Sequence, residues 1–116
     1  SRTGLKGANS TETGGLSGVP LFERSTIVLS KMRQRIGKNA AIIGVGGVDS
    51  AKAALVKIEA GADLVQLYTS FIYEGPGLAN KIVKGLSRAL DQSGAKSISE
   101  HCGRKTAEWA AKPIPA

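Results

Sequence analysis

Two apolar segments of the sequence end in residues suited to binding an anion. Gly46 and Gly47 follow segment 41–45, and the next apolar segment ends in Tyr68 and Thr69. A Gly-Gly turn lets the backbone approach a ligand closely, free N–H groups at a helix start point at an anion, and a threonine hydroxyl adds a donor. One such turn is equally consistent with a structural role alone. Two neighbouring strand ends of this character favour a phosphate site.

A second glycine-rich segment, residues 14–18, contains Ser17 and Gly18. Three glycines within this segment can lay the backbone against a flat ligand. Composition alone favours another interpretation, a flexible turn, because residues 1–20 are rich in Gly, Ser, Thr and Asn without a sustained period. Loops of this length in a compact domain are usually functional or disordered.

The sequence offers no residue pair for acid–base or nucleophilic catalysis. His101 is the only histidine and lies near the end of the chain, so no serine has a plausible base as its partner. The carboxylates fall mostly at expected capping or surface positions. His101 and Cys102 are adjacent and lack a third ligand nearby, which predicts an ordinary residue pair and no metal site. Trp109 is expected to anchor the C-terminal segment by packing.

Hydrophobic spacing and glycine stop signals divide the rest of the chain into helices and strands. A spacing of four in Val28, Met32 and Ile36 predicts a helix that Ser25 caps and Gly37 ends. Continuous apolar runs predict two strands buried on both faces, as in a parallel sheet. The expected order is a helix (25–36), a strand (41–45), a helix capped by Asp49 or Ser50 (50–59, stopped by Gly61), a strand (64–68), a short helical or irregular segment (69–73) and a helix stopped by Gly94 (76–93).

This order predicts an α/β fold. A strand, a helix and a strand joined by tight turns form a βαβ crossover. Two strands alone cannot close a sheet or bury both of its faces. We therefore expect the chain to be a piece of a larger α/β barrel or open sheet.

Composition narrows the class of protein. A chain of 116 residues fits one domain at most, and its 41% of hydrophobic residues is not typical of disorder. The net charge of +7 comes from bases spread over several segments without interleaved aromatics, which favours solvated helix faces over a nucleic-acid footprint. The single cysteine excludes an internal disulfide and indicates a reducing compartment. No apolar stretch reaches the length of a transmembrane helix.

Three segments, in this order, resemble one family. They are 12–18 (ETGGLSG), 42–48 (IIGVGGV) and 64–69 (LVQLYT), the last followed by 73–76 (YEGP). Their order and spacing are similar to the last quarter of the class 2 dihydroorotate dehydrogenases, which are quinone-dependent and membrane-associated. The resemblance extends from residue 1 to about residue 93. It implies a (β/α)8 TIM barrel, of which this chain supplies strands 7 and 8 with their helices.

By resemblance, the two strand ends bind FMN. Ser17 and Gly18 would lie in the loop after strand 6, against the flavin side of the cofactor. Residues 1–24 would be this active-site loop region, residues 25–96 the barrel portion, and residues 97–116 a C-terminal tail. Four residues would hold the FMN phosphate through backbone amides: Gly46, Gly47, Tyr68 and Thr69.

The resemblance also implies an activity, the oxidation of dihydroorotate to orotate in pyrimidine synthesis with a quinone as electron acceptor. The protein would be peripheral, at the cytoplasmic side of the inner membrane. The catalytic serine, the substrate-holding asparagines and the membrane-docking helices are expected upstream of Ser1, so we expect this chain alone to be inactive. Two alternatives stay open: another FMN- or sugar-phosphate-binding barrel, and a small basic nucleic-acid-binding module that would fold on its own.

Overall fold

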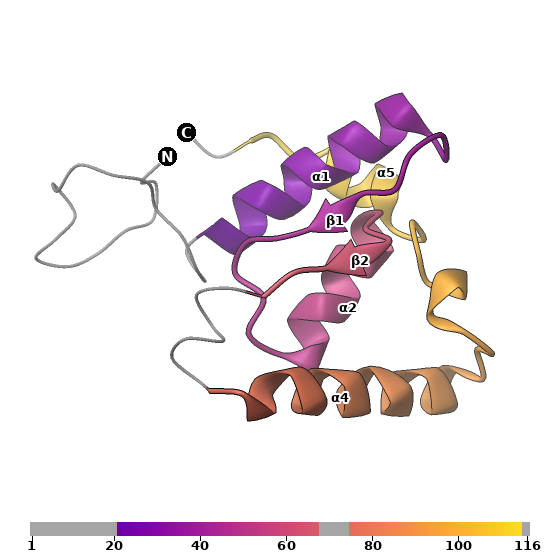
Figure 1. Cartoon of the computed structure of the whole chain (residues 1–116). Coiled ribbons are helices and arrows are strands. Elements are labelled where there is room, and N and C mark those ends of the chain that lie inside the picture. Colours follow the sequence, from indigo (N-terminus) through magenta and orange to yellow (C-terminus); the bar gives the residue numbers. More distant parts are fainter. Residues whose placement is uncertain (1–20, 68–74, 115–116) are drawn as a thin grey trace, which may run out of the picture.

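The structure is a short parallel sheet with helices packed against it (Figure 1). A computed structural model describes residues 21–67 and 75–114. Helix α2 lies between α1 and α4, and the C-terminal end of the described chain returns to α1 (Figure 1). The elements in chain order are α1 (Phe22–Ile36), β1 (Ile43–Gly44), α2 (Ala51–Ala60), β2 (Leu64–Val65), α4 (Gly77–Ser93), the 3₁₀ helix η2 (Ile98–Glu100) and α5 (Thr106–Ala110).

The two strands are parallel neighbours, with Ile43 opposite Leu64. Gly44 lets β1 lie close to the helices, because an added Cβ would be 3.0 Å from the Cβ of Ala62 and 3.3 Å from the side chain of Leu29. This strand, helix and strand confirm the predicted α/β class. The predicted strands were longer than the observed ones, and the predicted end of the second strand at Tyr68 lies outside the described residues.

Two small hydrophobic clusters hold the helices together. One joins α2 to α4 through buried side chains of Val48, Ala54, Leu78 and Ile82. The other lies beneath α1 and contains Leu29, Ala60 and Ala62, with the partly buried Trp109 packed against it. This contact agrees with the predicted anchoring role of Trp109. Helix α2 contributes to both clusters, with Ala54 in the first and Ala60 in the second.

Glycine and serine signals located most helix ends correctly. Ser50 caps α2, and its Oγ accepts a hydrogen bond from the backbone N–H of Ala53 at 3.1 Å. Helices α1, α2 and α4 end at Gly37, Gly61 and Gly94, each with a positive φ. Such backbone angles cost glycine little, which explains why these residues mark the ends.

The predicted start of α1 was wrong, and the side of the helix with Val28 and Met32 is not its most buried side. The helix begins at Phe22, and Ser25 lies inside its first turns instead of capping it. Val28 and Met32 are 41% and 48% exposed. The buried side of α1 includes Thr26 and Ser30, whose hydroxyls donate to helix carbonyls at 2.6 and 2.7 Å and so need no other partner.

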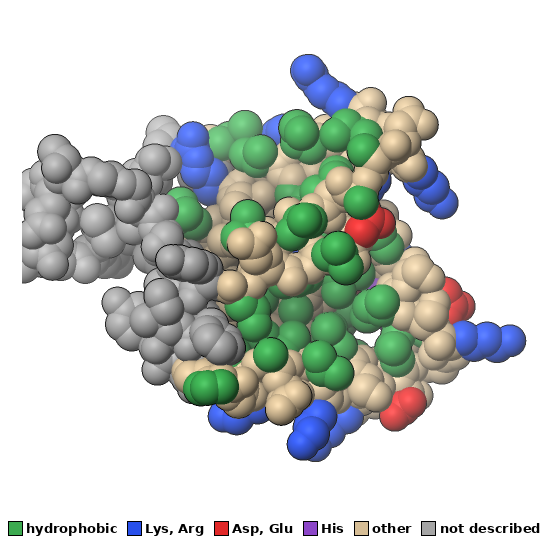
Figure 2. Space-filling model, viewed as in Figure 1, with side chains coloured by type: hydrophobic (Ala, Val, Ile, Leu, Met, Phe, Trp, Pro, Cys, Tyr) green, Lys and Arg blue, Asp and Glu red, His purple; other side chains and the backbone are tan. Residues whose placement is uncertain are grey.

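The outer face of the sheet is apolar and uncovered in this chain. Ile43, Val45 and Leu64 are 53%, 49% and 60% exposed. Figure 2 shows hydrophobic side chains gathered over the centre of this face, with the basic side chains around its rim. A face of this kind is typical of a strand whose two sides are both buried in a larger sheet.

The segment after α4 is more ordered than the predicted tail. Residues Ile98–Glu100 of the predicted tail form η2, and α5 was not predicted either. Backbone N–H groups of Gly103 and Lys105 donate to the last carbonyls of α2 at 3.0 and 2.8 Å. Lys31 of α1 donates to the carbonyl of Ala110 at 2.7 Å. Within residues 21–67 and 75–114, no helix combines the length and hydropathy needed to cross a bilayer.

The contact between α4 and α2 requires a small residue at Gly85. An added Cβ would lie 2.2 Å from the Cβ of Ala51. We therefore expect Gly85→Ala to lower the free energy of unfolding by about 1–3 kcal/mol, although alanine favours a helix over glycine. Denaturant unfolding measures the change. Gly77→Ala is the matched control, because an added Cβ there meets nothing within 4 Å; equal effects of the two variants would contradict the close packing.

Candidate functional site: the glycine turn after β1

The turn after β1 has a backbone conformation that suits glycine alone. Gly46 and Gly47 have φ angles of 104° and 73°, where a side chain is strained. A Cβ on Gly46 would lie 2.6 Å from Oγ of Ser25, and one on Gly47 would lie 2.6 Å from Cβ of Phe22. The turn therefore rests directly on the first turn of α1.

Two helix starts meet at this turn. Helix α2 begins just after it, and α1 begins against it. The N-terminal end of a helix carries a partial positive charge and backbone N–H groups without a partner inside the helix. The turn lies at the carboxyl end of a parallel strand, with two such helix ends beside it. This environment favours the binding of an anion.

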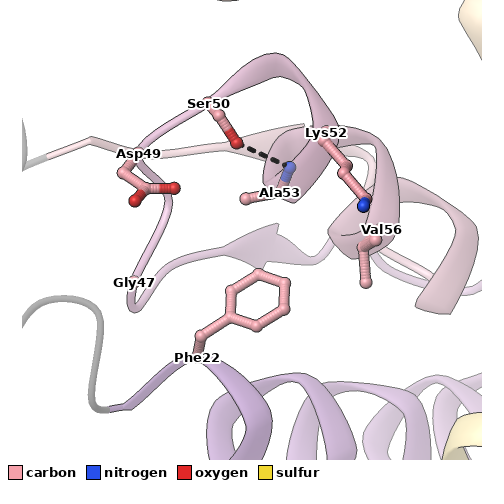
Figure 3. A pocket seen from close by; sticks show the side chains of 7 residues that line it. All are labelled: Phe22, Gly47, Asp49, Ser50, Lys52, Ala53 and Val56. Carbon is pink, nitrogen blue, oxygen red and sulfur yellow. Dashed lines mark hydrogen bonds between the residues drawn. The ribbon is translucent and has the colours of Figure 1, made fainter.

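A cavity of about 260 Å³ lies on the helix side of the turn. In Figure 3 the ring of Phe22 lies between the turn and α2. Most of the wall is apolar, and Asp49 and Lys52 bring one charge of each sign. The Asp49 carboxylate makes the cavity itself a poor place for a phosphate. The residues that line it are Phe22, Gly47, Asp49, Ser50, Lys52, Ala53 and Val56.

A fully buried lysine joins the turn to both helices. Lys57 of α2 is 0% exposed. Its Nζ donates to Oγ of Ser25 and, at 3.3 Å, to the backbone carbonyl of Phe22. The same Nζ lies 4.9 Å from the centre of the Phe22 ring, within the range of a cation–π contact. Ser25 Oγ in turn lies 3.4 Å from the carbonyl oxygen of Gly46, so Lys57, Ser25 and the turn form one connected group.

Burial lowers the pKa of Lys57 from 10.5 to about 8, because the ammonium has lost its water. The side chain is therefore still mainly protonated at neutral pH. Lys57 was not among the residues predicted from the sequence. It lies three residues after Ala54, on the buried face of α2, and this helical spacing is the signal that could have identified it.

Only two of the predicted site residues fall in the described part of the chain, Gly46 and Gly47. Strand β2 runs parallel to β1 and directly beside it. Val65 of this strand and Leu67 just after it pack against the cluster between α2 and α4. Four other predicted residues lie outside the described residues: Ser17, Gly18, Tyr68 and Thr69.

His101 and Cys102 have separate structural partners. His101 is 4% exposed, and its ring nitrogens lie 3.1 Å from Oγ of Ser93 and 2.9 Å from the guanidinium of Arg104. Cys102 Sγ donates to the carbonyl of Ala62 at 3.4 Å. Across residues 21–67 and 75–114, no three His, Cys, Asp or Glu side chains gather as a metal site would need.

The opposite ends of the strands are held by an ion pair. Arg33 pairs with Asp63 and also donates to the carbonyls of Gly61 and Gly37. The backbone N–H of Ile42 donates to Asp63 at 2.8 Å, and this hydrogen bond, together with Arg33, holds the pKa of Asp63 below its usual value. These partners engage Arg33 and Asp63, two of the charged residues that line a larger cavity of about 680 Å³.

The sequence matches the family described as dihydroorotate dehydrogenase over residues 2–90. The chain belongs to the dihydroorotate dehydrogenase family. The family resemblance predicted from the three sequence segments is thereby confirmed.

Similar members of this family include curated relatives from Brucella. The chain is 61% identical over 115 residues to "Dihydroorotate dehydrogenase (quinone)" of Brucella ovis and 60% identical to the protein of the same name of Brucella melitensis. Each alignment covers 98% of this chain and 32% of the relative. The chain thus spans about a third of the length of these relatives.

Solved dihydroorotate dehydrogenase structures share the fold. The ligand-free enzyme of Eimeria tenella is 37% identical with a TM-score of 0.83, and covers 89% of this chain and 28% of its own. The complex of that enzyme with ferulenol is 38% identical with a TM-score of 0.79, over 84% and 26% of the two chains. These enzymes are TIM barrels, so the prediction that the chain is a portion of such a barrel is confirmed.

The lowered pKa of Lys57 predicts how stability changes with pH. The unfolded lysine keeps a pKa near 10.5 and the folded one has about 8, so the unfolded state binds more protons between these values. The stability contribution of Lys57 should therefore be lowest below pH 8 and rise towards pH 10.5. Denaturant unfolding of the full-length protein measures this at about pH 7 and about pH 10. The free energy of unfolding of Lys57→Met, relative to that of the native protein, should be lower at the higher pH. Lys52→Met, at an exposed position of the same helix, is the control, and a pH-independent difference for Lys57→Met would contradict the prediction.

Proposed function

We propose that this chain is the phosphate-binding portion of a quinone-dependent dihydroorotate dehydrogenase. The observation that carries the proposal is the 61% identity to "Dihydroorotate dehydrogenase (quinone)" over 115 residues. The complete protein would oxidise dihydroorotate to orotate, with FMN as cofactor and a quinone as the final acceptor. It would act as a peripheral protein at the cytoplasmic side of the inner membrane, through segments outside this chain.

The turn after β1 fits the phosphate end of FMN. A side chain on Gly47 would collide with Phe22, so glycine is what lets the turn lie against the start of α1. Two helix starts add partial positive charge where the dianionic phosphate would sit. We assign phosphate binding to the backbone amides of Gly46 and Gly47 on the strand side, away from the Asp49 carboxylate.

Four further residues complete the proposed cofactor site. The amides of Tyr68 and Thr69, after β2, would hold the phosphate from the neighbouring strand end. Ser17 and Gly18 would approach the flavin side from the preceding loop. When bound, FMN would supply the two-electron acceptor for the substrate. The residues of this chain would anchor and orient that group, while the proton-abstracting serine would belong to the rest of the barrel, so this chain alone is expected to be inactive.

The apolar outer face of β1 and β2 supports this division of roles. Exposed Ile43, Val45 and Leu64 need other strands to cover them, and the family's solved chains are more than three times longer than the part that this chain matches. The proposed activity therefore belongs to the full-length barrel. A nucleic-acid module would bury such residues within its own fold, so the uncovered face disfavours that alternative.

The activity is tested on the full-length protein with dihydroorotate in the absence of oxygen. A quinone-dependent dihydroorotate dehydrogenase should be yellow, lose its flavin absorbance when dihydroorotate is added, and regain it when a quinone follows. Bleaching by another substrate, and not by dihydroorotate, would favour a different FMN barrel. A colourless protein that binds no FMN would refute the proposal.

Gly47→Val should weaken FMN retention in the full-length protein. The side chain would collide with Phe22 and displace the turn, so we expect FMN affinity to fall at least about tenfold, or about 1.4 kcal/mol. Flavin fluorescence after gel filtration measures the cofactor retained. Gly37→Ala is the matched control, because Gly37 also has a positive φ, of 63°, yet a Cβ there meets nothing within 4 Å. Unchanged cofactor content in Gly47→Val would show that the turn is only structural.

A further inference from the structure

The buried Lys57 is connected to the glycine turn through the hydroxyl of Ser25. Its ammonium donates to Ser25 Oγ, and Ser25 Oγ lies 3.1 Å from the carbonyl oxygen of Phe22 and 3.4 Å from that of Gly46. These atoms come from α2, α1 and the turn. A fully buried ammonium needs hydrogen-bond partners, because an unpaired buried charge is costly. Lys57 therefore fixes Ser25, and the carbonyl of Gly46 lies against this fixed hydroxyl.

The direction of that carbonyl also determines where a backbone donor points. The carbonyl of Gly46 and the N–H of Gly47 belong to one planar peptide unit, and in a trans peptide they point in opposite directions. No peptide bond in the described ranges is cis. Since the Gly46 carbonyl points toward Ser25 of α1, the Gly47 N–H is directed away from α1.

Other contacts around Lys57 strengthen this arrangement. Nζ also donates to the Phe22 carbonyl at 3.3 Å and faces the Phe22 ring at 4.9 Å. Phe22 is the residue against which Gly47 rests. Both glycines of the turn are thus supported by residues that Lys57 holds, one through Ser25 and one through Phe22.

We propose that Lys57 is a positioning residue for the cofactor: acting through Ser25, it aims the Gly47 N–H at the phosphate of FMN. The inference rests on the proposed function. It adds that the phosphate site depends on a charged side chain behind the turn, which does not itself touch the ligand. Lys57 would thereby act on the phosphate end of FMN and leave the flavin ring unaffected.

The test compares FMN with riboflavin, which lacks the phosphate, on the apo form of the full-length protein. Lys57→Met should weaken FMN binding about tenfold, as expected for one misdirected hydrogen bond to a charged group. Riboflavin affinity should stay within about twofold of the native value, because the flavin ring contacts are unaffected. Lys84→Met removes an exposed charge from α4 and should change neither affinity.

Ser25→Ala provides a second variant that keeps the lysine in place. It should give the same selective loss of FMN, and the double variant should lose no more than either single one, because both act through one chain of hydrogen bonds. Should Lys57→Met fail to fold, Ser25→Ala alone decides. Parallel loss of FMN and riboflavin, or equal loss in Lys84→Met, would overturn the inference while leaving the proposed function intact. A native protein that binds no FMN would overturn both.

Discussion

A lysine ammonium is buried where α1, α2 and the turn after β1 come together. Lys57 reaches this point from α2, and its partners are a serine hydroxyl, a backbone carbonyl and an aromatic ring, none of which carries a negative charge. The charge is tolerated because these groups replace some of the hydrogen bonds that the ammonium would make to water. The replacement is incomplete, and burial therefore lowers the pKa of Lys57. Because these partners sit on α1, the lysine constrains how α1 meets the turn, and the site geometry follows from that junction.

Close approach between small residues is the second constraint. Gly44 lets β1 lie on the helices, Gly46 and Gly47 let the turn lie on α1, and Gly85 lets α4 lie on Ala51 of α2. Side chains at these places would separate elements that now touch. The family's barrel architecture therefore depends, in this chain, on positions where the backbone of one element meets its neighbour with nothing between them.

The sequence predicted features whose cause is local and missed those that arise from distant contacts. The helix ends at Gly37 and Gly61 were predictable because positive φ angles favour glycine wherever it stands. The start of α1 was misplaced at Ser25, because that residue's hydroxyl serves Lys57 and the turn instead of a helix cap. The burial of Lys57 was not predicted, since its partner Phe22 lies 35 residues away. For the site itself, Gly46 and Gly47 were predicted from composition and order. Their supporting residues Lys57, Ser25 and Phe22 could be recognised only from the three-dimensional structure.

The C-terminal segment bears on the order in which this region assembles. Carbonyls at the end of α2 receive hydrogen bonds from Gly103, Lys105 and Thr106, and the partners Ala60 and Thr106 are 46 residues apart. During synthesis, α2 therefore leaves the ribosome well before the groups that complete its C-terminal end. Until those residues arrive, the carbonyls of the last turn of the helix have only water, Gly61 and Ala62 as partners. The hydrogen bonds at the C-terminal end of α2 are thus completed late, by residues 103–106, which include none of the proposed cofactor-binding residues.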